Sequence, residues 1–214
     1  MARHLKTKPI DEETQIMKKR TLFIGLVVLA TISACSQPPL PQDHFYRLDV
    51  AAPSQGSQPL LKGVLEVDRL NADGLLGGRS LLYTEKGKEA EIKEYHYHLW
   101  TEAPPSLIQD RMVSFLRTAK VADNIVTPKM RITSDYTING RIRHLERAVG
   151  GAAPKVIVEL ELGLKDQKDD RLVFVDTYRE EVEHQDDTVI QSVTSMNRAM
   201  SAIFGRFLSD IKSR

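Results

Sequence analysis

The chain's one cysteine, Cys35, stands in a sequence context that gives its thiol a definite chemistry. It ends the run Ile32-Ser33-Ala34-Cys35, which follows a short apolar stretch. Small residues directly before a cysteine at the end of a secretory signal are typical of a bacterial lipobox. The sequence therefore predicts that the thiol of Cys35 receives a diacylglyceryl group and that the signal is cleaved between Ala34 and Cys35.

The residues before the cysteine have the layout of a secretory signal. A cationic group at residues 18–20 precedes an apolar run over residues 21–34. A run of that length gives about 21 Å of helix, whereas a span of the bilayer needs roughly 20 apolar residues and about 30 Å. A short transmembrane helix is the alternative interpretation. Met17 directly precedes the cations and is the better start of the signal, and Met1 with an extended basic region stays the alternative.

Two histidines form the other group of residues whose spacing could support chemistry. His96 and His98 lie two apart in an alternating segment, so they share one face of a strand, and such a pair can chelate a metal. No third ligand can be placed from the sequence, and two partly exposed strand histidines are the alternative. The sequence contains no GxSxG, HExxH, CxxC, P-loop or EF-hand motif. We therefore expect a protein that is not an enzyme, with no metal and no cofactor.

Composition restricts the class of protein further. Residues 1–34 form the extension and signal, residues 35–43 a lipidated cysteine with a Pro-rich tether, and residues 44–214 a single domain. Cleavage leaves 180 residues with 24 Lys and Arg against 26 Asp and Glu, so neither sign of charge dominates and nucleic-acid binding has no support. A single cysteine excludes an intramolecular disulfide and a cysteine-based zinc cluster. An apolar core must therefore stabilise the domain.

Hydrophobic periodicity predicts the elements of that domain. Alternating segments indicate strands over residues 44–50 and 61–70, a hairpin formed by residues 80–83 and 90–100, and an antiparallel meander of residues 135–148, 156–164 and 171–183. Apolar residues at helical spacing indicate amphipathic helices over about 105–119 and 187–211, the second with Thr188 and Gln191 as a capping box. The fold class we expect is α+β, with a mainly antiparallel sheet and both helices packed on it.

Three features could contact a partner rather than the core. Leu75 and Leu76 lie in a Gly-rich connection and either form an exposed apolar tip or fold back onto the core. Trp100, the only tryptophan, ends a strand and either packs beneath the following helix or forms a partner hot spot. The apolar seam of the C-terminal helix, rich in Met and Phe, is interpreted as core, with a partner groove as the alternative.

Several segments of the sequence resemble those of a known family. Its lipobox, the segments HFYRLDV and LEVDRL, and the stretch RSLLYTEKGKEAEIKEYHYHLWTEAPPSLIQDRMVSFLR are similar to the ABC-type transport auxiliary lipoproteins, the PqiC-like partners of mammalian-cell-entry (MCE) lipid transporters. The resemblance covers about residues 44–211. It implies helices packed on a sheet of antiparallel strands and a non-enzymatic role beside an MCE protein, a permease and an ATPase.

The resemblance also implies a place in the cell. Ser36 follows Cys35 where inner-membrane lipoproteins have aspartate, which favours the periplasmic face of the outer membrane. The sequence is compatible with two functions: a docking adaptor, or a periplasmic lipid carrier with its own apolar cavity between the sheet and the C-terminal helix. It is also compatible with an oligomer. An envelope hydrolase is a third interpretation, but no nucleophile and base can be named for it.

Overall fold

The computed structural model describes residues 40–214, and residues 42–214 form one unit. The predicted signal, the predicted cleavage site between Ala34 and Cys35, the predicted lipidation of Cys35 and residues 36–39 of the predicted tether lie outside the described residues. Within residues 40–214 no helix is long and apolar enough to cross a membrane.

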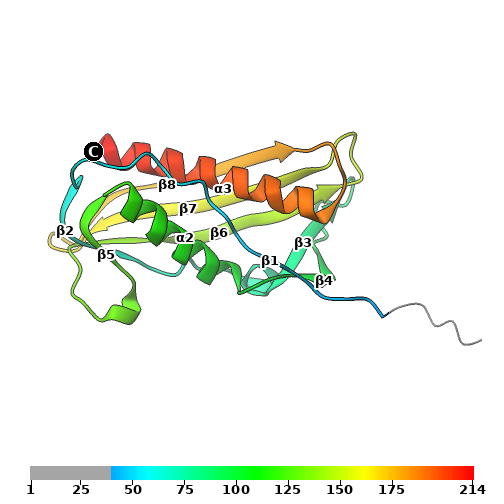
Figure 1. The fold of residues 1–214 in the computed structure, drawn as a ribbon, viewed down its shortest axis with the longest axis horizontal. Helices are drawn as coiled ribbons and strands as arrows, with labels where there is room; N and C mark the ends of the chain where they lie inside the picture. Colours follow the sequence, from blue (N-terminus) through cyan, green and yellow to red (C-terminus); the bar gives the residue numbers. More distant parts are fainter. Residues whose placement is uncertain (1–39) are drawn as a thin grey trace, which may run out of the picture. The chain divides into compact units, whose positions relative to one another are not determined.

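Eight strands, two α-helices and two short 3-10 helices make up the unit (Figure 1). In chain order they are β1 (His44–Tyr46), β2 (Leu61–Val67), η2 (Gly74–Gly77), β3 (Ser80–Glu85), β4 (Lys93–Trp100), α2 (Pro104–Thr118), β5 (Ala122–Val126), η3 (Pro128–Met130), β6 (Tyr136–Val149), β7 (Lys155–Asp166), β8 (Arg171–Glu183) and α3 (Val189–Lys212).

All eight strands belong to one sheet, which is mixed. Its order is β1-β4-β3-β6-β2-β5, with β7 and β8 joined through β6. The β3–β4, β6–β7 and β7–β8 pairs are antiparallel, which confirms the predicted hairpin and meander. The β1–β4, β2–β5, β2–β6 and β3–β6 pairs are parallel. The prediction of a mainly antiparallel sheet was therefore wrong.

The length of β6 explains the parallel pairs. This strand of 14 residues exceeds its neighbours, so β2 pairs with its first residues and β3 with its last ones along the same edge. Both run parallel to it, while β7 occupies its other edge. The helix α2 then carries the chain from β4 to β5, which pairs in parallel with β2. Periodicity reveals strands, but it does not reveal which strand becomes the neighbour of which.

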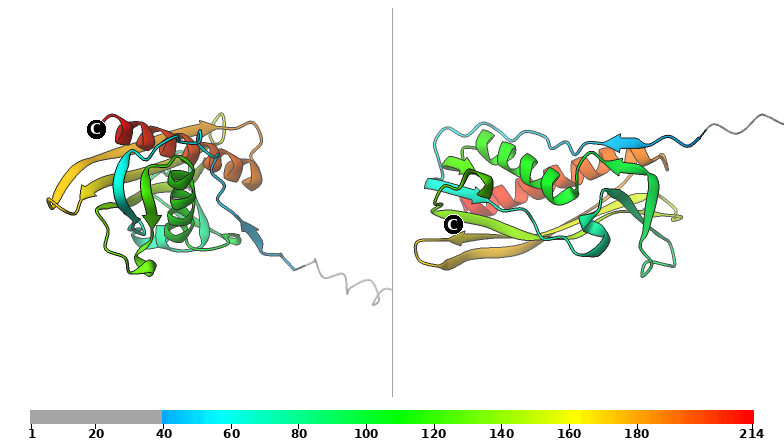
Figure 2. Two further views of the ribbon diagram at one scale, coloured as in Figure 1. Left: turned by 60° about the vertical axis from the view of Figure 1, so that its left-hand side comes forward. Right: turned by 90° about the horizontal axis from the view of Figure 1, so that it is seen from below.

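Both helices form where the periodicity predicts them and lie on one face of the sheet (Figure 2). Pro104 and Pro105 occupy the first turn of α2, where a missing N–H costs nothing. At the start of α3 the Thr188 hydroxyl accepts a hydrogen bond from the amide of Gln191. The seam of α3 is buried against β7 and β8, with Phe204 1% exposed, so it belongs to the core.

The predicted first strand is shorter than expected and a further strand was missed. Only His44–Tyr46 pairs with β4, and the chain then crosses the helices, where the amide of Asp49 bonds to Asn197 and that of Ala51 to Ser201. Leu48, just beyond β1, is buried in the core. The missed strand is β5, whose five residues are too few to show a period.

Candidate docking surface

The exposed tip predicted at the Gly-rich connection is half present. Residues 74–77 form η2, in which Leu75 is 39% exposed, whereas Leu76 packs against the core. Gly74 has φ +57°, a left-handed conformation that suits glycine. Arg141 of β6 holds the segment in place through a bridge to Asn71 and an ion pair with Asp73 at 3.9 Å. The structure therefore offers one leucine side chain here, not two.

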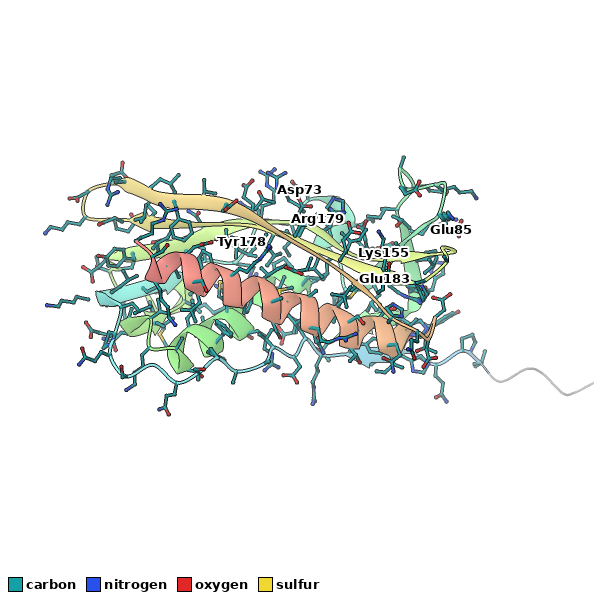
Figure 3. All side chains as sticks on the ribbon, turned by 90° about the horizontal axis from the view of Figure 1, so that it is seen from above. Asp73, Glu85, Lys155, Tyr178, Arg179 and Glu183 are labelled. Atoms are coloured by element: carbon teal, nitrogen blue, oxygen red, sulfur yellow. The ribbon has the colours of Figure 1, made fainter. Side chains whose placement is uncertain are left out.

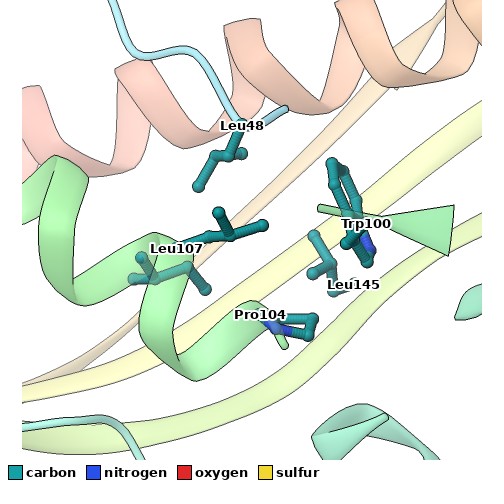
Figure 4. A pocket seen from close by; sticks show the side chains of 6 residues that line it. Leu48, Trp100, Pro104, Leu107 and Leu145 are labelled. Carbon is teal, nitrogen blue, oxygen red and sulfur yellow. The ribbon is translucent and has the colours of Figure 1, made fainter. Parts of the chain in front are cut away.

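Trp100 lies in the core. Its side chain is 2% exposed and faces Leu48, Pro104, Leu107 and Leu145 (Figure 4). These side chains surround a small apolar pocket that leaves no space for a water molecule. This burial agrees with the packing interpretation. A direct contact between Trp100 and a partner stays a prediction that no finding tests.

Arg79 connects η2 to the edge formed by β1 and β4. Its carbonyl accepts from the Trp100 amide at 2.7 Å, and its Nε donates to the Trp100 carbonyl at 3.1 Å. Its guanidinium lies over the ring of Phe45, 5.5 Å from the centroid. Phe45 is 55% exposed. Sequence reasoning assigned Phe45 no function, although a large exposed aromatic residue beside an arginine is a signal of binding.

We call Phe45, Leu75, Arg79 and Tyr97 the η2–β4 surface. Tyr97 is also exposed and lies on β4 two residues before Leu99, the residue that pairs with Phe45. Exposed aromatic, leucine and arginine side chains are the composition of many protein–protein contacts. This arrangement can hold a partner but offers no group that could catalyse a reaction.

The two histidines of β4 have different surroundings. The hydroxyl of Tyr46 and Nδ1 of His98 share a hydrogen bond of 2.8 Å, and the His44 ring stacks on His98 at 5.0 Å. Burial, together with His44 and Arg147, lowers the pKa of His98 and so disfavours the protonated ring. His96 is exposed. Among residues 40–214 no three His, Cys, Asp or Glu side chains are grouped to hold a metal ion.

A buried arginine, which sequence reasoning missed, connects β6 to the start of α3. Arg147 is 3% exposed, and its Nε donates to the Ser192 hydroxyl at 2.7 Å. Its other nitrogens bond to the Tyr95 hydroxyl and to an Asp187 carboxylate oxygen, the latter at 2.8 Å. The guanidinium also lies over the Tyr95 ring, 5.4 Å from the centroid. Each end of this arginine is satisfied within the fold, which indicates a structural role.

The same network contains a serine next to a histidine, which could suggest a nucleophile and its base. The Ser192 hydroxyl lies 3.0 Å from His184 Nε2. Ser192 is 0% exposed, however, and its oxygen already accepts from Arg147 and can donate to the Thr188 carbonyl. No substrate can reach that oxygen, so the pair fails the geometric requirement for a nucleophile.

The chain is similar to a known family and to solved structures. A family model described as "ABC-type transport auxiliary lipoprotein component" matches residues 46–206. The crystal structure of protein XCC0632 from Xanthomonas campestris is similar with a TM-score of 0.67 and 16% identity, covering 77% of this chain and 92% of that chain. A crystal structure of an uncharacterized protein is similar with a TM-score of 0.62 and 15% identity, covering 79% and 99%. These two likenesses concern the fold alone. No curated protein matches this chain.

Proposed function

We propose, on the premise that this chain belongs to the ABC-type transport auxiliary lipoprotein family, that it is a lipid-anchored docking adaptor of an MCE-type ABC transport system. The family match over residues 46–206 is the observation that carries the proposal. The family indicates a lipoprotein that assists a transporter, and no enzyme family is indicated. The buried Ser192 adds a physical reason why the one serine–histidine contact of the network is not catalytic.

The anchor in this proposal is the lipid on Cys35. A diacylglyceryl group supplies two acyl chains, and acylation of the new amino terminus would add a third, which makes attachment stable where one chain would be reversible. Ser36 after the lipidated cysteine, where inner-membrane lipoproteins have aspartate, favours the periplasmic face of the outer membrane in this proposal. Labelling with radioactive palmitate tests the anchor: incorporation should require Cys35, and unchanged incorporation in Cys35→Ala would refute it.

The partners in this proposal are an MCE protein, which forms the lipid conduit, and the permease and ATPase that supply energy from the inner membrane. Transport of lipid across the envelope is the activity that the complex would perform. The adaptor holds the conduit at the outer membrane through the η2–β4 surface, where Phe45 lies beneath the Arg79 guanidinium and Leu75 of η2 adds exposed apolar area.

Site-specific photo-crosslinking tests this surface. We expect a photoreactive residue at Leu75 to capture an MCE protein in intact cells. The matched control is Leu172 on β8, which is 53% exposed but lies outside the η2–β4 surface. Capture from Leu75 and not from Leu172 would support the surface. Equal capture from both positions would refute the surface, and capture from neither, with no MCE protein in a pull-down, would refute the partner.

The lipid-carrier alternative gains no observation in its favour. The Met and Phe seam of α3 that motivated it is buried in the core, with Met196 0% and Phe207 1% exposed. The apolar pocket beside Trp100 has no space for a water molecule and therefore none for an acyl chain. We therefore propose no second function.

A further inference from the structure

An open pocket lies between the end of β3 and the β6–β7–β8 meander, away from the η2–β4 surface. Its volume is about 530 Å³, within the range of small-molecule sites. The pocket is lined by Glu85 of β3, Glu146 of β6, Lys155 of β7, Glu181 and Glu183 of β8, and residues 151–153 of the loop between β6 and β7. Figure 3 shows Glu85, Lys155 and Glu183 at the same end of the sheet.

Glu146 is the unusual residue of this wall. It is 4% exposed, and its Oε1 lies 3.2 Å from His144 Nδ1. Its Oε2 is buried and accepts no hydrogen bond from any protein group among residues 40–214. A buried carboxylate oxygen without a donor loses its hydration and gains nothing in return, which is costly. The fold therefore leaves this acceptor without a protein donor among residues 40–214.

Two of the three cations that line this pocket, Lys155 and Arg179, are already paired with carboxylates. Lys155 Nζ lies 2.5 Å from Glu181 Oε2, and Arg179 lies 2.6 Å from both Glu159 and Glu181. Hydrogen bonds from Lys155 and then from Arg179 lower the pKa of Glu181, so both cations stabilise the charged form of that carboxylate. The wall as a whole carries five carboxylates against three Lys and Arg side chains. A positively charged donor is thus the group that Glu146 lacks.

The other lining residues narrow the class of donor. A metal ion would find too few ligands, because no three acidic, histidine or cysteine side chains in residues 40–214 are grouped to hold one. Ala148, Ala153 and Ile157 add apolar wall that suits a short alkyl stem. Lys86 also lines the pocket and forms no ion pair among the described residues, so it can accept an anion attached to that stem.

We infer that this pocket binds a primary ammonium group on a short alkyl stem: the buried Glu146 carboxylate turns toward the pocket so that Oε2 accepts one of the N–H bonds, and Lys86 faces the attached anion. Phosphoethanolamine has this chemistry, either as a free compound or as the headgroup of a lipid. A quaternary ammonium such as phosphocholine has the same charge but no N–H to donate. The inference goes beyond the docking proposal and does not need its partners.

Calorimetric titration of the full chain, purified in a maltoside detergent, tests the inference. We expect phosphoethanolamine to bind at least about tenfold more tightly than phosphocholine, as the loss of a charge-assisted hydrogen bond implies. This comparison needs no variant. No heat with phosphoethanolamine at millimolar concentration, or equal binding of the two compounds, would overturn the inference and leave solvent as the donor to Glu146.

Two matched variants locate the site. Glu146→Gln keeps the shape but removes the charge and should weaken phosphoethanolamine binding about tenfold or more. Glu102→Gln removes an exposed carboxylate that lies outside the pocket and should leave binding within about twofold. Unchanged binding in Glu146→Gln would overturn the assignment. If that variant does not fold, the comparison of the two compounds still decides.

Vesicles distinguish the two sources of the ammonium group. The same protein is mixed with vesicles of phosphatidylethanolamine in phosphatidylcholine and with vesicles of phosphatidylcholine alone. If the protein binds the vesicles that contain phosphatidylethanolamine and free phosphoethanolamine displaces it from them, the ligand is a lipid headgroup. Binding of the free compound without any difference between the vesicles identifies a soluble amine. Either result supports the pocket. The inference is refuted if the protein binds neither free phosphoethanolamine nor the phosphatidylethanolamine vesicles in preference to phosphatidylcholine alone. This outcome does not depend on whether an MCE protein is captured.

Discussion

Replacement of Arg147 by methionine tests whether the buried arginine holds α3 to the sheet. Methionine keeps an unbranched apolar stem of similar length, so the packing along β6 changes little. The change removes the donors to Ser192 and Tyr95, the stacking on the Tyr95 ring, and the ion pair with Asp187. What is lost is therefore a set of polar contacts rather than core volume.

The size of the loss follows from the burial of each partner. Ser192 is 0% exposed, so it loses a donor that water cannot replace, at about 1–2 kcal/mol. The contacts with Tyr95 add about 1–2 kcal/mol, since that hydroxyl is half-buried. The Asp187 side chain is 61% exposed and rehydrates, which keeps the total below that of a fully buried broken pair. We expect a loss of about 2–4 kcal/mol, or about 30-fold to 700-fold in the folding equilibrium.

Urea denaturation of residues 42–214 measures this loss, with Arg143→Met as the control. Arg143 lies on the same strand, four residues before Arg147, and forms an exposed ion pair with Glu161. Exposed pairs contribute little, so the control should unfold at nearly the wild-type urea concentration. A midpoint for Arg147→Met equal to that of the wild type, or an equal loss in both variants, would refute the structural role.

Four further changes give distinct outcomes. Trp100→Ala should cost about 3–5 kcal/mol in urea denaturation, because the emptied space lies in a closed core. Thr188→Ala should cost about 1 kcal/mol through the loss of the N-cap of α3. Burial and the hydrogen bond to Asp210 raise the pKa of Tyr178. The stability that this shift contributes is present below the ordinary tyrosine pKa of about 10 and falls as the pH rises above it. Tyr178→Phe should therefore reduce the loss of folding stability measured between pH 8 and pH 11. Leu75→Ser should leave the unfolding midpoint unchanged and weaken capture of the partner in a pull-down.

The sequence predicted the helices and the meander because their periods are long enough to read. Residues 156–164 alternate over a whole strand, and the seam of α3 repeats over 24 residues of helix. The parallel pairs escaped prediction because strand partners are chosen by tertiary packing, which the order of apolar and polar residues does not encode. The short β5 escaped because five residues include too few repeats of a period of two.

The candidate docking surface could be predicted only in part, for a related reason. Leu75 was recognisable because an apolar residue in a Gly-rich turn is exposed unless the turn folds back, and Leu76 does fold back. Phe45 became a candidate only when Arg79, distant in sequence, was found over its ring. Sequence gives the side chains of such a surface, but the fold decides which of them meet.

The neighbours Glu146 and Arg147 illustrate this limit within a single strand. Both are charged and both are buried, and nothing in the sequence tells them apart from the exposed charges of β6. Successive residues of a strand point to opposite faces, so the arginine turns toward α3 and the glutamate lines the pocket beside β3. There the arginine finds an acceptor for each end of its guanidinium, whereas one glutamate oxygen finds no donor. The satisfied arginine is therefore a structural residue, whereas the unsatisfied oxygen of Glu146 is the group on which the proposed amine site depends.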